Sequence, residues 1–264
     1  FSNKGTVYRR KAYQIPEGGR TSRGIAVVNL LGIQKGEKIT TVIPIREEEF
    51  EKSRETDDLY LYMATRQGKV KKVALHAFAN LRNREIVAIS LVEGDELIRV
   101  RLSSVAENVI LTTRKGKSVY FSGKEIRPMG RAAMGCRGIA LDKNDYLIDL
   151  SMVQPDSDED ILLITENGSG KRTPLKFYRL TKTRGGKGVK SIQLNKERGE
   201  VVSVKVVNER DELVLISQQG IIIRVPVREI SRTGRNSVGV KVMNLDQDDK
   251  VASVATVPQS HAIN

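Results

Sequence analysis

Short apolar segments separated by turn sequences follow one another along the chain and predict β-strands. They are rich in Leu, Ile, Val and Tyr, and they are too brief for buried helices. Four of them stand directly before a turn: Leu59–Met63, Val109–Leu111, Ile161–Ile164 and Leu213–Ile216. Each unit closes with a similar segment, such as Ile39–Ile43 or Leu97–Val100, and only Glu47–Glu55 favours a turn or two of helix. The pattern therefore predicts an all-β protein.

The turns recur at a regular distance. Each ends in glycine, because a tight hairpin needs a residue that adopts positive φ. The five turn glycines are Gly5, Gly68, Gly116, Gly168 and Gly220. They repeat about every 50 residues, and the first interval is longer because an acidic insertion at 46–58 interrupts it. This period, with about four strands per unit, is typical of a β-propeller.

A second landmark follows every turn and keeps its place in each repeat. Its residues are Gly24, Glu85, Gly135, Gly188 and Gly239, and a leucine always stands six positions later. Two positions before that leucine the residue is always apolar, and such i, i+2 pairs indicate a strand with one buried face. The alternative of two unrelated β domains does not explain why the leucines keep this register.

The landmarks define five units at 1–46, 59–104, 108–153, 161–207 and 213–257. We expect them to form one propeller-like domain, 1–257, in which neighbouring blades bury each other's faces. The segment 258–264 is then a short C-terminal tail.

Composition excludes several classes of protein. The longest apolar stretch, Ile25–Ile33, is too short for a membrane-spanning helix, which needs roughly 20 residues. One cysteine and two histidines leave neither an intrachain disulfide nor a Cys/His zinc site. We therefore expect a cytoplasmic fragment of a longer protein, without a metal site, a membrane contact or catalytic residues.

Positive charge repeats in register with the predicted fold. The chain has 45 Lys and Arg against 32 Asp and Glu, a formal charge of +13. Four of the five units carry arginine four positions before the second landmark, and four of five carry a basic residue four positions after the turn glycine. Such groups neutralise phosphates, so we predict a DNA-contacting set: Arg9, Arg20, Arg23, Lys72, Arg82, Arg131, Arg137, Arg172, Arg184, Lys187, Arg224 and Arg235. The alternative is that these side chains are ion-paired staples between blades or solvated loop charges.

Several segments resemble the C-terminal DNA-wrapping domain of the DNA gyrase A protein, part of a bacterial type II topoisomerase. They include Phe1–Arg9, Tyr13–Glu17, Gly24–Leu31, Ala79–Arg82, Gly168–Pro174 and Ile230–Arg235. The resemblance runs from Phe1 to about Val257. It implies a six-bladed β-pinwheel, a propeller relative whose blades exchange strands. It also implies that duplex DNA bends around the rim with positive handedness and that ATP-driven strand passage then gives negative supercoiling.

Two departures from the family pattern qualify this resemblance. Only five full units are present, so we expect a first blade upstream of Phe1. The family's box Gln-Arg-Arg-Gly-Gly-Lys-Gly belongs to that blade. In this chain only Arg184–Gly188 match its last five residues, and the Gln-Arg start is absent. The box's role in wrapping is therefore not assigned to these residues.

The resemblance also implies partners and leaves rival functions open. It implies double-stranded DNA, the rest of the gyrase A protein and the gyrase B protein in an A2B2 holoenzyme associated with the nucleoid. The fragment itself would need no cofactor, while the parent enzyme would need ATP and Mg²⁺ through other domains. The equivalent domain of topoisomerase IV and a peptide-docking propeller remain alternatives. A propeller enzyme would need converging acids or a metal site, which the sequence does not show.

Overall fold

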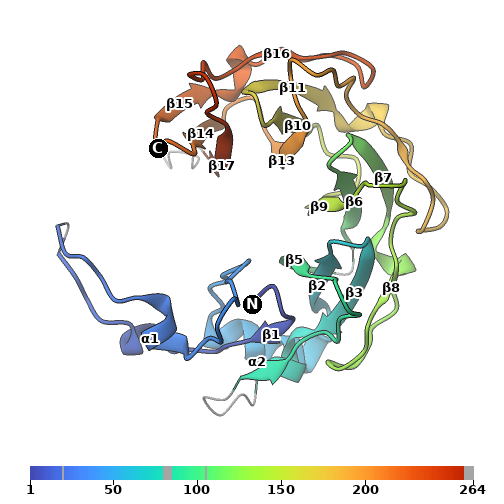
Figure 1. Ribbon diagram of the computed structural model, residues 1–264. Helices are drawn as coiled ribbons and strands as arrows, with labels where there is room; N and C mark the ends of the chain where they lie inside the picture. The colour runs from blue at the N-terminus through green and yellow to red at the C-terminus, as the bar shows by residue number, and fades with distance from the viewer. Residues whose placement is uncertain (20, 80–84, 105, 259–264) are drawn as a thin grey trace, which may run out of the picture. The chain divides into compact units, whose positions relative to one another are not determined.

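The chain folds into two compact units that are built mainly from antiparallel strands (Figure 1). The computed structural model describes residues 1–19, 21–79, 85–104 and 106–258. The first unit comprises Phe1–Ser104 with Arg127–Cys136, and the second comprises Val105–Ile126 with Arg137–Asn264. The prediction of a mostly β, propeller-like fold is confirmed.

The first unit contains a four-stranded sheet. Its order is β5 (Leu97–Ser104), β2 (Leu59–Thr65), β3 (Lys69–Ala74) and β8 (Cys136–Arg137). Three strands come from one repeat, and β8 comes from the next. A smaller pair, β1 (Thr6–Val7) with β4 (Ile86–Val87), repeats this exchange between the first and second repeats.

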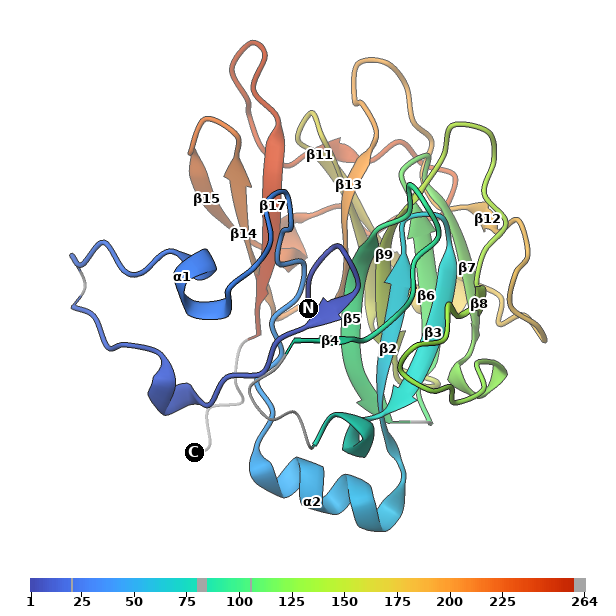
Figure 2. The same cartoon turned by 60° about the horizontal axis from the view of Figure 1, so that its bottom comes forward.

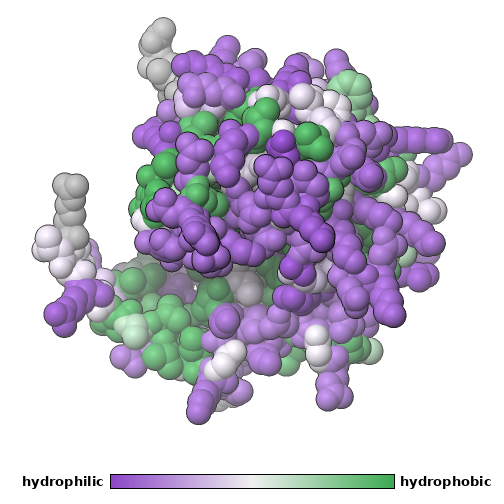
Figure 3. Space-filling view, turned by 45° about the horizontal axis from the view of Figure 1, so that its top comes forward, coloured by the Kyte–Doolittle hydropathy of each residue, from purple (hydrophilic) through white to green (hydrophobic). Residues whose placement is uncertain are grey.

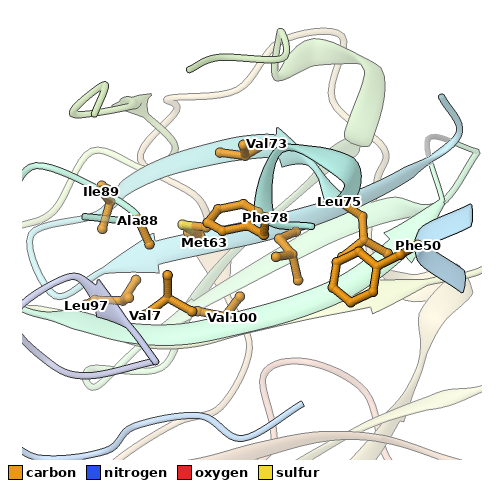
Figure 4. Packing of buried hydrophobic residues seen from close by; sticks show 11 residues of the cluster. Val7, Phe50, Met63, Val73, Leu75, Phe78, Ala88, Ile89, Leu97 and Val100 are labelled. Carbon is orange, nitrogen blue, oxygen red and sulfur yellow. The ribbon is translucent and has the colours of Figure 1, made fainter. Parts of the chain in front are cut away.

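The core of the first unit contains residues from the four-stranded sheet and from the β1–β4 pair. Phe50 reaches it from α2 (Glu47–Thr56), which Figure 2 shows beside the 3₁₀ turn η2 (Leu75–Phe78). Figure 4 shows Phe50, Met63 and Phe78 packing in this cluster, and all three are buried. The predicted helix in the acidic insertion is thus confirmed. One apolar residue, Phe50, packs its inner face against the core.

The second unit contains three sheets. The first has the order β12 (Val189–Lys190), β7 (Lys117–Ser122), β6 (Asn108–Thr113), β9 (Leu147–Val153). The second has the order β13 (Val201–Val207), β10 (Asp160–Thr165), β11 (Ser169–Pro174), β16 (Val240–Lys241). The third has the order β15 (Ile222–Pro226), β14 (Glu212–Ser217), β17 (Val251–Val257).

Each exchanged strand crosses to the outer edge of the preceding blade. In the second unit β12 pairs with β7, and β16 pairs with β11, in both cases over only two residues. A 3₁₀ turn precedes each crossing: η3 (Gly123–Glu125), η4 (Leu175–Phe177) and η5 (Val227–Glu229). Because neighbouring repeats share strands, the architecture is that of a β-pinwheel.

Glycine occupies both landmarks in every repeat except the second, which has Glu85 at the second landmark. The turn glycines have φ between 75° and 89°, and the N–H of each donates to the carbonyl three residues earlier. At the second landmark an added Cβ on Gly188 would lie 2.7 Å from the Ser118 carbonyl, and one on Gly239 would lie 2.6 Å from that of Gly170. These close approaches let the exchanged strand pair with the preceding blade.

The apolar positions after the second landmark are buried in four of the five repeats. Ile89, Ile139, Ile192 and Met243 are each about 1% exposed. The predicted strands around them are shorter than expected, because only the two residues after the landmark pair as strands. The remaining apolar side chains enter the core from bends.

The first repeat differs from the prediction. Its segment after Gly24 forms a short helix, α1 (Val27–Leu31), instead of a strand, and Val28 is half exposed. Only an isolated bridge between Ser2 and Ile39 represents the predicted strand Ile39–Ile43. Figure 2 shows α1 lying away from the sheet that holds β2 and β3. The helix satisfies backbone groups locally, as the Gly32 N–H donates to the Val28 carbonyl at 2.8 Å.

Candidate nucleic-acid interface

The loops that lead into the exchanged strands carry the first set of predicted basic residues. In the second unit Arg184 and Lys187 precede β12, and Arg235 precedes β16. Lys187 is exposed, and Arg184 and Arg235 are half-buried. The fold explains where these side chains lie. Each crossing loop leads to the outer edge of the preceding blade, and the landmark glycine lets the exchanged strand pair with that edge.

Arginines of successive repeats make the same contact on this edge. Arg184 Nη1 donates to the carbonyl of Arg137 at 2.8 Å, and Arg235 Nη1 donates to that of Lys190 at 3.1 Å. Each acceptor lies two residues after the landmark of the preceding repeat. The strand exchange therefore sets guanidinium groups one after another along the outer edge of the second unit.

Arg184 is oriented by a second bond that still leaves donors for a ligand. Its Nε donates to the Glu125 carbonyl at 3.1 Å. In the part of the chain that the structure describes, these two bonds engage two of the five guanidinium N–H groups. The side chain is thus held in place while it keeps its charge at the surface.

Lysine side chains surround the carboxylate of Asp142 at this edge. A hydrogen bond from Lys117, whose Nζ lies 2.5 Å from an Asp142 carboxylate oxygen, lowers the pKa of Asp142. The charges of Lys187 and Lys115 lower that pKa further. The face drawn in Figure 3 is largely hydrophilic, with many long polar side chains projecting from it.

The remaining members of this set lie at comparable places or outside the described residues. Arg131 is exposed in the crossing loop before β8 in the first unit, and Arg137 is exposed on β8. Arg23 is exposed in the segment before α1. Arg20 and Arg82 lie outside the described residues.

The second predicted set, four residues after each turn glycine, has a different role. In four blades this residue pairs with the residue 12 positions earlier, on the neighbouring strand. The pairs are Lys72 with Tyr60, Tyr120 with Asn108, Arg172 with Asp160, and Arg224 with Glu212. The repeated position therefore holds a polar contact within each blade.

The prediction is wrong for Lys72 and Arg172 as DNA contacts, because both side chains are buried. The Lys72 ammonium lies 5.0 Å from the centroid of the Tyr60 ring, and Arg172 Nη1 lies 3.1 Å from Asp160 Oδ2. The ion pair of Arg172 lies within its own blade, because Asp160 is on the neighbouring strand β10. Arg172 Nε also donates to the Ile230 carbonyl at 2.9 Å, which ties the end of η5 to β11.

Arg9 and Arg224 are paired but not buried. Arg9 lies over the Phe50 ring at 4.9 Å and 3.3 Å from Glu47, whereas Arg224 forms an ion pair with Glu212 and keeps 62% of its side chain exposed. Arg232, which sequence reasoning missed, also pairs with Asp160, at 3.0 Å. For Arg172 and Arg224, the acid 12 positions earlier is the signal in the sequence that points to the ion pair, whereas Lys72 has Tyr60 at that place.

Other sites are not evident in the residues described. Among residues 1–19, 21–79, 85–104 and 106–258, no group of three or more His, Cys, Asp or Glu side chains is placed to hold a metal ion. No helix among the same residues is long and apolar enough to cross a membrane.

Strand-exchanging blades with basic crossing loops define the class of protein, a β-pinwheel with a basic outer edge. The family described as DNA gyrase C-terminal domain, beta-propeller, matches residues 1–46, 59–104, 107–154, 159–208 and 211–258. The chain belongs to this family.

Among curated proteins, the chain is similar to DNA gyrase A proteins. It is 42% identical over 260 residues to the DNA gyrase A protein of Haloquadratum walsbyi, covering 98% of this chain and 30% of that protein. It is 39% identical over 259 residues to the DNA gyrase A protein of Staphylococcus aureus, covering 98% of this chain and 28% of that protein. The chain thus spans less than a third of the length of these relatives.

Solved structures share the fold. The C-terminal domain of a DNA topoisomerase IV has a TM-score of 0.86 at 25% identity, with 97% of this chain and 77% of that chain covered. A DNA gyrase A C-terminal domain has a TM-score of 0.81 at 26% identity, with 97% and 80% covered.

Proposed function

We propose that this domain binds duplex DNA without reading its sequence and bends it along the basic crossing loops. The observation that carries the proposal is the repeated contact of Arg184 and Arg235, which sets guanidinium groups at equivalent places on the outer edges of successive blades. Phosphates recur along a duplex whatever its sequence, so cations repeated in successive blades can contact them without base contacts.

The free energy of several phosphate contacts is large enough to offset the cost of bending DNA. Neutralising phosphates releases counterions, which gives affinity that depends steeply on salt. Bending 20–30 base pairs by 40–90° costs about 1–6 kcal/mol, so contacts at several repeats can offset it. The acidic first turn of α2, Glu47–Glu49, disfavours that helix as a groove-binding element.

Membership of the gyrase A family supports a wider role. In this role the domain wraps DNA for the gyrase holoenzyme, two gyrase A and two gyrase B proteins on the cytoplasmic nucleoid. ATP hydrolysis and strand cleavage then reside in other parts of the enzyme, and the wrap gives strand passage its negative supercoiling direction. The alternative role in topoisomerase IV has a structural neighbour in its favour, whereas identities of 42% and 39% to gyrase A proteins favour gyrase.

A linking-number experiment tests this function. Relaxed plasmid is incubated with the 264-residue chain, treated with a type I topoisomerase and deproteinised, and its topoisomers are separated. The proposal predicts a shift in linking number that grows with protein and falls for Arg184→Ala/Arg235→Ala. The control Arg210→Ala removes an exposed charge from a turn outside the crossing loops and should keep the shift. An unshifted distribution with the unaltered chain would overturn the proposal.

A further inference from the structure

Two buried lysines occupy the same place in their repeats. Lys71 on β3 and Lys171 on β11 each lie three residues after a turn glycine, and both side chains are fully buried. An ammonium group removed from water is costly unless its donors are satisfied. Their partners therefore show what these side chains do.

Lys171 bonds to the loop that carries Arg235. Its Nζ donates to the carbonyls of Gly234 and Arg235, each at 2.7 Å, and to Ser237 Oγ at 3.1 Å. These three acceptors match the three N–H donors of an ammonium. The N–H of Thr233 adds a backbone bond to the Arg172 carbonyl at 2.8 Å. The loop is thus held against β11 at the arginine itself.

Lys71 repeats this arrangement in the first unit. Its Nζ donates to the carbonyls of Ala88 at 2.7 Å and Ala133 at 3.0 Å, and also to that of Arg131. Arg131 and Arg235 are equivalent positions, four residues before the second landmark. In two repeats, therefore, an equivalent lysine ammonium holds the backbone of the equivalent arginine.

The loop of Arg184 shows how a crossing loop is held without such a lysine. The position equivalent to Lys171 is Val119 in that blade. Backbone bonds fix the loop instead: the Gly185 N–H donates to Gly138 at 2.7 Å, and the Ala140 N–H donates to Gly186 at 2.9 Å. The loop of Arg235 keeps one of these two bonds, because the Gln193 N–H donates to the Ser237 carbonyl at 3.0 Å, and the Lys171 ammonium adds to it.

We propose that Lys71 and Lys171 are positioning residues whose ammonium groups fix the loops that present Arg131 and Arg235 to DNA. The role in DNA binding rests on the proposed function, whereas the role in loop order does not. Without the ammonium, carbonyl oxygens that converge on one point lose their shared donor, and the loop moves to find others. The arginine then loses its fixed place on the blade edge.

A double-mutant cycle on the 264-residue chain tests the connection to DNA. The slope of log K against log salt is measured with a short duplex for Lys171→Met, Arg235→Ala and the double variant. Lys171→Met should flatten the slope by up to about 0.9, the value for one phosphate contact, and Arg235→Ala should add little to it. Arg184→Ala on the Lys171→Met background should add its full effect. Fully additive losses for Lys171 and Arg235 would overturn the proposal.

Amide hydrogen exchange without DNA tests the loop separately. Lys171→Met should speed exchange at Thr233 and Ser237, while Lys176→Met, which removes an exposed charge on η4, should not. Unchanged exchange in Lys171→Met overturns the positioning role. If Lys171→Met does not fold by circular dichroism, Lys71→Met with Arg131→Ala provides the same cycle in the first unit. If the unaltered chain binds no duplex, the proposed function fails, and the exchange result alone decides the role of the lysines.

Discussion

Arg172 and Asp160 form a buried ion pair between the neighbouring strands β11 and β10, with 3.1 Å between Nη1 and Oδ2. Their side chains are 6% and 4% exposed. Arg232 approaches the same carboxylate from the crossing loop at 3.0 Å. A residue that the charge pattern assigns to DNA therefore fastens its blade to the crossing loop of the next repeat.

Loss of this pair should destabilise the fold. Arg172→Ala leaves Asp160 buried with one partner fewer, so we expect the free energy of unfolding to fall by about 3–5 kcal/mol. Urea denaturation measures the loss. Arg224→Ala breaks the equivalent but exposed pair and should lower the same free energy by less than about 1 kcal/mol. Equal effects of the two variants would show that burial does not set the strength of these pairs.

The landmark glycines should be sensitive to a single methyl group. At Gly239 the backbone has φ of 79°, and an added Cβ would lie 2.6 Å from the Gly170 carbonyl. Gly239→Ala should therefore lower the free energy of unfolding by about 1–3 kcal/mol and weaken the pairing of β16 with β11. Gly24→Ala has similar φ but meets no atom within 4 Å, so its loss should be smaller. Thermal and urea unfolding compare the two, and a larger loss at Gly24 would contradict the role of the close contact.

The buried lysines predict a particular dependence of stability on pH. Burial lowers the pKa of both Lys71 and Lys171 from 10.5 to about 8, and for Lys171 the charge of Arg235 adds to the shift. Between about pH 8 and 10.5 the unfolded chain binds more protons than the folded one at these sites, so stability rises with pH. Lys71→Met/Lys171→Met lacks this rise.

Urea midpoints of the unaltered chain and this double variant measure the effect. As pH increases from about 8 to about 10, the urea midpoint of the unaltered chain should rise relative to that of the variant. Burial raises the pKa of Tyr178 to about 12, which lowers stability above about pH 10, but this contribution is common to both proteins. A difference in midpoint that stays constant with pH would show that both ammonium groups keep their proton throughout.

The repeat itself could be predicted because its landmarks are local. Each turn needs a glycine at φ near 80°, as at Gly168, and each repeat needs a buried apolar residue such as Ile192. Both requirements concern one position, so the same residue types recur in the sequence. The exchange of strands could not be worked out from such a pattern. A strand of two residues, such as β16, is too short to show alternation, and its partner lies in another repeat.

The candidate site was predicted in part for a related reason. Arg184 and Arg235 keep one offset from the landmark, and the structure places them equivalently on the blade edge. Arg172 keeps an offset just as regular, but its partner Asp160 is buried with it. Burial of a charge depends on packing that sequence spacing does not show. Lys171 was missed because the acceptors of its ammonium are mainly backbone groups, which no side-chain pattern reveals.

The salt dependence of duplex binding tests the central claim most directly. Arg131, Arg184 and Arg235 are replaced by alanine singly and together, with Arg210→Ala as the control, and the slope of log K against log salt is measured for each. If the crossing loops form the DNA track, each replacement flattens the slope by about 0.9, and the triple variant by about three times as much. A triple variant with the same slope as the unaltered chain would contradict the claim.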